Sequence, residues 1–491
     1  MSAAERPIVV AVIGAGPSGI YAAEALSQQS DVPVTVAVID RLPVPFGLVR
    51  YGVAPDHHSI RSIRNTLERT LEKSGVRFYG DVTIGRDLTI EQLRGVVDAV
   101  IYAYGAGSDR RLGIEGEDLF GSIAAPEFVA WYCGHPDVHP DVETVTPRSP
   151  VPATRAERAA RLIATTRSAV VVGVGNVALD VARVLIKPVD QLQDTDMADD
   201  VLASLADKTV TDVHILGRRG PAYTTFTTKE LRELGQLPGV DVVLDPADLE
   251  LDDSSSAVVQ QNKIAARNVA VMQQWAATPS TGAPRRIHFH FWTRPIAITG
   301  TTEVEAVQTE RTRLTAEGLV EGTGETDVIS AQLIVRSVGY KGVQLPGVPF
   351  DPNTGRVPHS EGRVIRDGGF SADEYVTGWI KRGPTGVIGT NKSDAVETVT
   401  SLLADIHDGA IHASHSIDEL DQLLARSGIH ALGMPAWHRI DAAEIELGES
   451  HGRQRTTLAH RRELLAAAED HHDNPFDAPA TPAQVGSEGA P

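Results

Sequence analysis

Two glycine-rich turns in this chain have the residue types and spacing needed to hold phosphate groups. The first, Gly14-Ala-Gly-Pro-Ser-Gly19, follows an apolar run at 8–13, and the second, Gly173-Val-Gly-Asn-Val-Ala178, follows another at 168–172. Glycine lets the backbone turn sharply and approach a pyrophosphate, and a helix that starts at the turn offers free N–H groups to the phosphates. Two such turns predict that one chain binds two dinucleotides.

The first turn carries every part of a dinucleotide-binding pattern. Gly14 permits the sharp turn, Gly16 lets the backbone approach the pyrophosphate, and Gly19 allows the helix to pack closely on the strand. Asp40 ends the next apolar run, where a carboxylate can accept hydrogen bonds from a ribose diol and would repel a 2′-phosphate. We therefore expect FAD or NAD(H) at this turn, and not NADP(H).

The second turn differs at the position that should face the ribose. Ala178 takes the third glycine position, and no carboxylate ends the following predicted strand at 211–216. Arg218 and Arg219 stand there instead, and guanidinium groups pair with phosphate oxygens through two parallel hydrogen bonds. The alternative is an exposed basic turn without a ligand. We expect the arginines to select NADPH over NADH.

Apolar runs that alternate with helical patterns predict an α/β fold with two Rossmann-like nucleotide-binding domains. From about residue 335 the glycine-rich pattern of the first half returns, which indicates that the second domain is inserted into the first. The expected parts are a first FAD-binding segment at 7–107, an NADPH-binding domain at 108–334, a second FAD-binding segment at 335–465 and a disordered tail at 466–491.

Composition removes several other classes of protein. The chain has 491 residues, a net charge of −20 and one cysteine, Cys133, which we expect to be buried. The acidic balance argues against nucleic acid as a partner, and one cysteine excludes a disulfide framework, a thiolate metal cluster and a redox cysteine pair. No metal site is expected, and His471 and His472 are interpreted as solvated. Without a signal sequence or an apolar run of about 18 residues, we expect a cytoplasmic protein with no membrane span.

Five longer segments make the pattern specific. They are VPFGLVRYGVAPDH at 44–57, GNVALDVAR at 175–183, GRRGP at 217–221, FTTKELREL at 226–234 and GWIKRGPTGVIGTNK at 378–392. Together they resemble adrenodoxin reductase and its bacterial counterparts, the adrenodoxin-reductase-like ferredoxin–NADP(+) reductases. The resemblance implies a glutathione-reductase-like architecture with the NADP domain inserted into the FAD domain. It also implies one bound FAD, electron transfer from NADPH to a ferredoxin, and a monomer.

The resemblance further implies individual contacts to each cofactor. For FAD these are Ser18, Asp40, Leu48, Val82, Trp379 and the backbone of Gly386, Val387 and Ile388. For NADP(H) they are Gly175, Asn176, Val177, Ala178, Leu179, Arg218, Arg219, Glu230 and Gly386. Asp40 departs from the glutamate common in the family, which shortens its reach but keeps its charge.

Two further segments suggest how the chemistry runs. The glycines of 378–391 let backbone N–H groups reach a flavin ring, and Trp379 can cover the nicotinamide side, while hydride transfer itself needs no acid or base. His57, in a loop rich in glycine and proline, can relay the proton that accompanies electron transfer, because its reference pKa is near neutral. Glu233, one helical turn after Glu230, is the expected partner. The alternative is that His57 only bonds a turn and Glu233 is solvated.

The docking surface for an acidic ferredoxin needs positive charge. Lys263 and Arg267, at i and i+4, share one face of a predicted helix at 260–275, and Arg61 and Arg64 form a competing patch. For each pair alone, an ordinary solvated helix face is the alternative.

Other functions fit two nucleotide folds less well. A quinone reductase, diaphorase or monooxygenase that uses NADPH is one alternative, and a non-catalytic NADPH- or flavin-binding redox sensor is another. A quinone reductase needs an apolar membrane-facing surface, and a sensor is expected to have lost ring-contact residues such as Trp379 and Gly386. Ferredoxin–NADP(+) reductase activity is therefore the preferred prediction.

Overall fold

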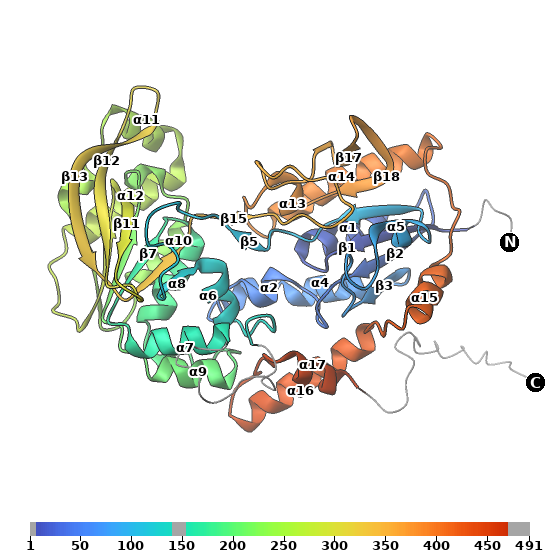
Figure 1. Ribbon diagram of the computed structural model, residues 1–491, viewed down its shortest axis with the longest axis horizontal. Coiled ribbons are helices and arrows are strands. Elements are labelled where there is room, and N and C mark those ends of the chain that lie inside the picture. Colours follow the sequence, from blue (N-terminus) through green and yellow to red (C-terminus); the bar gives the residue numbers. More distant parts are fainter. Residues whose placement is uncertain (1–5, 140–153, 470–491) are drawn as a thin grey trace, which may run out of the picture.

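The structure is a computed structural model, and it describes residues 6–139 and 154–469. Figure 1 shows two bodies side by side, each built around a sheet with helices packed on it. The termini of the described chain belong to the right-hand side of this view, and the middle of the chain forms the left-hand body.

The first sheet takes its strands from both ends of the chain, in the order β16-β17-β18-β4-β1-β2-β3. β1 (Ile8–Ile13) is buried at every residue and pairs in parallel with β2 (Val34–Ile39) and β4 (Ala99–Tyr102). β18 (Gly369–Val376) adds to β4 in parallel, so a strand far along the chain completes the parallel part. The remaining strands are β3 (Val76–Tyr79), β16 (His359–Ser360) and β17 (Arg363–Arg366).

The second sheet is parallel throughout, in the order β6-β14-β7-β8-β10-β9. Its centre is apolar because both faces are covered. Helices cover one face, and on the other Val170, Val172 and Leu216 pack against Ile298, Val304 and Val307. The strands are β6 (Ser122–Ala124), β7 (Ser168–Val172), β8 (Asp212–Leu216), β9 (Val240–Leu244), β10 (Arg285–His290) and β14 (Leu333–Arg336).

The chain crosses between the two bodies twice, and the crossings pair with each other. β5 (Ser108–Asp109) runs antiparallel to β15 (Tyr340–Lys341) at the place where Figure 1 shows the bodies joined. A separate antiparallel sheet, β11 (Thr293–Thr299), β12 (Ala306–Leu314) and β13 (Val320–Ser330), lies on the outer side of the second body.

Two long helices begin beside the glycine turns. α1 (Pro17–Gln28) starts at the first turn and packs on α14 (Thr390–His407), and α8 (Asn176–Ile186) starts at the second. The other α-helices are α2 (Leu48–Tyr51), α3 (His58–Arg61), α4 (Arg64–Leu71), α5 (Ile90–Arg94), α6 (Ala125–Tyr132), α7 (Arg155–Thr165), α9 (Asp199–Ala206), α10 (Thr228–Leu234), α11 (Asp253–Gln261), α12 (Lys263–Ala276), α13 (Trp379–Arg382), α15 (Ile417–Arg426), α16 (Met434–Ser450) and α17 (Arg461–Ala468).

The parallel strands at the centre of each sheet confirm the predicted α/β fold with two nucleotide-binding units, while the domain boundaries themselves stay a prediction. One difference concerns the tail expected at 466–491, because α17 continues to Ala468, whose side chain is buried. Residues 470–491, with His471 and His472, lie outside the described residues. Cys133 is buried as expected, and burial raises the pKa of its thiol to about 12. Within the described ranges, no helix is long and apolar enough to span a membrane.

Candidate functional site

The first glycine turn can be built only with glycine at two of its positions. Gly14 has φ +112, and a Cβ there would lie 2.6 Å from the carbonyl oxygen of Ala103, at the end of β4. A Cβ on Gly19 would overlap the carbonyl oxygen of Gly14. A Cβ on Gly16, in contrast, would meet no atom within 4 Å, so the turn is open on that side.

The open side of this turn offers unused hydrogen-bond donors. The amides of Gly16, Ser18 and Gly19 have no acceptor within the described part of the chain, and they lie at the N-terminus of α1. A dinucleotide pyrophosphate satisfies such groups, and the positive end of the helix dipole favours its charge. The residues at the turn therefore fit the diphosphate of FAD.

Asp40 has a structural role in addition to the expected contact with a ribose. Its two oxygens accept hydrogen bonds from the amides of Ala15, at 2.7 Å, and Leu42, at 2.9 Å. Burial raises the pKa of Asp40, and the two amide bonds oppose that shift. Asp40 thus clamps the glycine turn to the loop after β2, and each oxygen keeps a second lone pair for a ribose hydroxyl.

The glycine-rich segment at 378–391 lies against the first glycine turn. Ser18 Oγ donates to Asn391 Oδ1 at 2.8 Å, and a Cβ on Gly378, which has φ +78, would overlap Ser18 Oγ. Trp379 follows directly, with its ring centroid 5.2 Å from that of Tyr340. The segment is therefore held against the start of α1.

The turn before α14 exposes its backbone. Gly386 has φ +83, Val387 is 60% exposed, and the amides of Gly386 and Ile388 find no acceptor among the residues that the structure describes. Free amides beside the first turn fit a flavin ring, which carries hydrogen-bond acceptors.

Two of the expected FAD contacts differ in how they can act. Leu48 is 37% exposed and follows Gly47, whose backbone lies against Gly16. Val82 is buried in the core, and its amide donates to the carbonyl oxygen of Asp40 at 2.9 Å. The contact of Val82 with FAD stays a prediction.

The second glycine turn repeats the first in its geometry. Gly173 has φ +131, and a Cβ there would overlap the carbonyl oxygen of Ser337, after β14. The amides of Gly175, Asn176 and Val177 have no acceptor in the described ranges. The side chain of Asn176 accepts a hydrogen bond from the amide of Thr227 at 2.8 Å, which ties the turn to α10.

Not all of the second turn faces outward. Ala178 and Leu179 lie in the first turn of α8 with fully buried side chains, and their contact with NADP(H) stays a prediction. Arg218 is exposed and forms no ion pair within the described residues, and Arg219 lies over the ring of Tyr223 at 5.5 Å. The arginines follow β8, at the same edge of the sheet as the turn, and their free donors suit a phosphate group.

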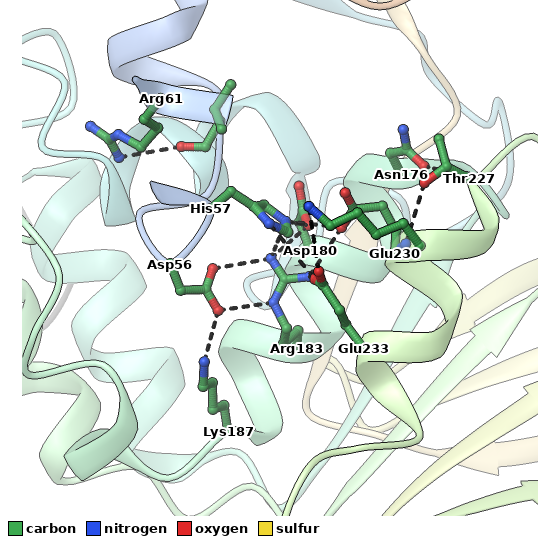
Figure 2. A network of polar contacts seen from close by, with 12 residues as sticks. Asp56, His57, Arg61, Asn176, Asp180, Arg183, Lys187, Thr227, Glu230 and Glu233 are labelled. Carbon is green, nitrogen blue, oxygen red and sulfur yellow. Dashed lines mark hydrogen bonds and ion pairs between the residues drawn. The ribbon is translucent and has the colours of Figure 1, made fainter. Parts of the chain in front are cut away.

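A cluster of charged side chains joins the two bodies, as Figure 2 shows. Asp56 and His57 come from the loop before α3, and their partners come from α8 and α10 of the second body. The cluster consists of Asp56, His57, Asp180, Arg183, Lys187, Glu230 and Glu233.

His57 is held by carboxylates on both of its ring nitrogens. Nε2 lies 2.9 Å from Asp180 Oδ1 and 3.0 Å from Glu230 Oε2, and Nδ1 lies 3.7 Å from Glu233 Oε2. Burial lowers the pKa of His57, but the hydrogen bonds to Asp180 and Glu230 outweigh it and raise the pKa to about 9. The carboxylates therefore favour the charged imidazole, while the neighbouring Arg183 guanidinium opposes it.

Glu230, which is expected to contact NADP(H), also belongs to this cluster, and the expected contact stays a prediction. Its carboxylate is buried and directed at His57 and at Arg183, whose Nη1 lies 3.5 Å away. Glu233 is where the sequence predicted it, beside His57, and its side chain is 31% exposed. Asp180 and Arg183 were not predicted individually, although the segment at 175–183 contains both.

The two candidate basic patches differ in how exposed and how free of ion pairs their side chains are. Lys263 and Arg267, on α12, are exposed. Arg61 is instead paired with Asp196 at 2.9 Å with a side chain only 13% exposed, and Arg64, 27% exposed, lies 4.0 Å from Asp441. The competing patch at Arg61 and Arg64 is therefore not a free positive surface.

Comparison with known proteins gives matches over nearly the whole chain. The model of the pyridine nucleotide-disulphide oxidoreductase family matches residues 8–263. NADPH-ferredoxin reductase FprA of Mycobacterium tuberculosis (strain CDC 1551 / Oshkosh) is 44% identical over 94% of this chain and 99% of its own. The mitochondrial NADPH:adrenodoxin oxidoreductase of Arabidopsis thaliana is 36% identical over 95% of this chain and 96% of its own. A solved structure of Mycobacterium tuberculosis FprA in complex with NADPH superimposes with a TM-score of 0.85 at 43% identity, covering 94% of this chain and 100% of that chain.

Two open glycine turns at matching edges of two parallel sheets define the class of flavoprotein oxidoreductases that bind two dinucleotides. The chain belongs to the pyridine nucleotide-disulphide oxidoreductase family and, within it, to the NADPH-ferredoxin and adrenodoxin reductases. Having one cysteine, it lacks the cysteine pair of the disulfide reductases.

Proposed function

We propose that this chain is an FAD-dependent ferredoxin–NADP(+) reductase, which takes hydride from NADPH and passes electrons singly to a ferredoxin-type iron–sulfur protein. The observation that carries the proposal is the 44% identity to an NADPH-ferredoxin reductase over 99% of that protein. The open first turn and the free arginines of the second turn support it independently.

Each of the two bodies binds one of the two cofactors. Segments 7–107 and 335–465 hold FAD through the free amides of the first turn, Asp40 and the turn at 386–388, and segment 108–334 holds NADPH. When bound, FAD accepts a hydride from the nicotinamide and gives up its electrons one at a time. Trp379 covers the site beside the flavin and limits the access of water.

The arginines after β8 give the second body its preference for NADPH. Arg218 is exposed and Arg219 lies over Tyr223, so both present N–H groups at the sheet edge where an adenosine ribose lies in this fold. A 2′-phosphate pairs with these groups, whereas the bare diol of NADH leaves them unpaired.

His57 and Glu233 are proposed as a proton route. Asp180 and Glu230 hold Nε2, which leaves Nδ1 to face the partly exposed Glu233 at 3.7 Å. A proton on Nδ1 can pass to the Glu233 carboxylate and from there to solvent with little movement. Asp180 and Glu230 position the ring rather than exchange protons with solvent, because both are buried.

Lys263 and Arg267 are the proposed docking residues for ferredoxin. Both are exposed on α12, in a chain whose net charge is −20. A local positive patch on an acidic protein orients an acidic partner without binding anions in general. The proposal also includes a monomer in the cytoplasm, and size-exclusion chromatography tests the monomer.

The activity is tested with the FAD-loaded protein, NADPH, cytochrome c and a bacterial ferredoxin. The proposal requires that cytochrome c reduction depend on added ferredoxin and rise in proportion to it. Full activity with a quinone and none with ferredoxin would favour a quinone reductase, and no turnover with any acceptor would favour a redox sensor.

A further inference from the structure

Three side chains of the kinds that bind metals meet at a point away from both glycine turns. His139 follows α6, Asp200 lies in the first turn of α9, and His460 immediately precedes α17. One ligand atom from each lies within 4.8 Å of the other two. His139 is 1% exposed, so the group reaches from the interior to the surface.

Both imidazoles are oriented by backbone carbonyls. His139 Nε2 lies 3.0 Å from the carbonyl oxygen of Trp131, and His460 Nδ1 lies 3.1 Å from the carbonyl oxygen of His139. A carbonyl oxygen only accepts, so each of these nitrogens carries a hydrogen. The other nitrogen of each neutral ring is then a free lone pair, which is how proteins commonly fix metal-binding histidines.

The remaining nitrogen of His139 lacks a hydrogen bond. Its Nδ1 is buried and lies 3.2 Å from Asp200 Oδ2, but no group in the described part of the chain forms a hydrogen bond with it. Asp200 Oδ1 accepts from the amide of Val201 at 2.8 Å, which leaves Oδ2 directed at the histidine. A lone pair on Nδ1 that faces a carboxylate oxygen at 3.2 Å is unfavourable unless a proton or a metal cation lies between the two atoms.

Space for a further ligand adjoins the group. A cavity of about 180 Å³ is lined by His139, Asp200, His460 and Ser204, among others. The volume is sufficient for ordered water beside a bound cation. A tetrahedral site with three protein ligands and one water therefore fits.

We propose that His139 Nδ1, Asp200 Oδ2 and His460 Nε2 bind one divalent transition-metal ion, with zinc as the best match. Two imidazole nitrogens and one carboxylate oxygen suit zinc, which accepts four ligands in a tetrahedral arrangement. The ion would join the C-terminal helices to α9 and to the end of α6. Its role is to stabilise that junction rather than to take part in electron transfer.

Two other groups of candidate ligands are less suitable. The group of His57, Asp180 and Glu230 already contains a cation, because Arg183 Nη2 lies 2.8 Å from Asp180. The group of Glu68, Glu72 and His438 is largely exposed. The proposed group was not found in the sequence because its residues are far apart along the chain and share no motif.

The test uses tag-free, FAD-loaded protein that has been treated with chelator. Zinc is titrated by calorimetry, and thermal unfolding is followed with and without zinc. The wild type should bind one zinc per chain and unfold at a higher temperature with zinc present. His460→Gln and Asp200→Asn should each weaken zinc binding by at least about tenfold.

Two control variants test whether zinc binds at other histidines of the chain. His471→Gln with His472→Gln removes a histidine pair that could itself bind zinc, and His430→Gln removes an exposed histidine elsewhere. Both controls should bind zinc as the wild type does, and anomalous diffraction at the zinc edge should place the ion between His139, Asp200 and His460. Wild-type affinity in His460→Gln, or loss of binding in the tail variant, would overturn the proposal.

Discussion

Arg183 and Asp56 form an ion pair with two hydrogen bonds across the junction of the two bodies. Arg183 Nε and Nη2 lie 3.0 and 3.1 Å from the two carboxylate oxygens of Asp56. Both side chains are less than a tenth exposed, and Lys187 Nζ lies 3.0 Å from the same carboxylate. The α8 helix, which begins at the second glycine turn, is thus fixed to the loop that carries His57.

Replacing Asp56 should destabilise the junction. Asp56→Asn removes the carboxylate charge that faces Lys187 and one of those that face Arg183, which keeps its ion pair with Asp180 at 2.8 Å. Breaking a buried ion pair costs about 3–5 kcal/mol, so we expect a loss of at most that size. Denaturant unfolding measures the change, with Glu321→Gln as the control because its pair with Arg313 is exposed and worth about 0–1 kcal/mol. Equal effects of the two variants would show that the ionic junction contributes no more than a surface pair.

The charge on His57 should make stability depend on pH. Its pKa of about 9 in the folded protein lies above its unfolded value of about 6.5, so its stabilising contribution is complete below pH ~6.5 and is lost as pH rises through 9. The stability difference between wild type and His57→Gln should therefore be largest near pH ~6 and shrink by about 3 kcal/mol at most toward pH ~10. His430→Gln, at an exposed position, is the control variant. A constant difference for His57→Gln would contradict the raised pKa.

Alanine substitutions at two glycines of the first turn should have different effects, one on FAD binding and the other on stability. Gly16→Ala adds a methyl group where no protein atom lies within 4 Å and where φ is −78, so the FAD-free protein should keep its stability. The methyl group should nevertheless weaken FAD binding, because it occupies the side facing the pyrophosphate. Gly19→Ala overlaps the Gly14 carbonyl and should destabilise the FAD-free protein itself. Thermal unfolding and FAD titration separate these effects, and normal FAD affinity in Gly16→Ala would place the diphosphate elsewhere.

Arg218 should set the preference for NADPH. Losing a hydrogen bond between a charged pair costs about 1.5–3 kcal/mol, so Arg218→Gln should raise the KM for NADPH roughly 10–100-fold. The kcat should change little, because the contact is made equally before and during the reaction, and the KM for NADH should stay the same. Arg313→Gln, at an exposed arginine outside the site, is the control. An equal rise in KM for both nucleotides would refute a role in phosphate recognition.

The patch on α12 should act only on the protein partner. Lys263→Glu with Arg267→Glu should slow ferredoxin-dependent cytochrome c reduction and reduce its sensitivity to salt, while ferricyanide reduction by NADPH stays unchanged. Arg426→Glu, at an exposed position on α15, controls for charge alone. If the control slows the ferredoxin reaction as much, docking does not depend on α12.

Local sequence patterns predicted the parts of the fold that local physics controls. The run at 8–13 is β1 residue for residue, and Gly14 and Gly173 need positive φ because each turn lies against a neighbouring strand end. The arginines after β8 were also found from position alone. Each of these features depends on residues within one β-α-β unit.

Long-range contacts could not be predicted in the same way. His57 was recognised as a candidate, but the identity of its partners depends on how the second body packs on the first. Asp180 is 123 residues from His57, and no local pattern indicates that the carboxylate of Glu230 lies 3.0 Å from the imidazole. Arg61 appeared to be a free surface charge because its partner, Asp196, lies on a distant loop.

Electron transfer from NADPH through the flavin to ferredoxin is tested by following the flavin during anaerobic mixing with each nucleotide. Absorbance at about 450 nm reports oxidised flavin. We expect rapid bleaching by NADPH, much slower bleaching by NADH, and full recovery of the absorbance when oxidised ferredoxin is added. Equal bleaching by NADH and NADPH, or no recovery with ferredoxin, would contradict this route of electron transfer.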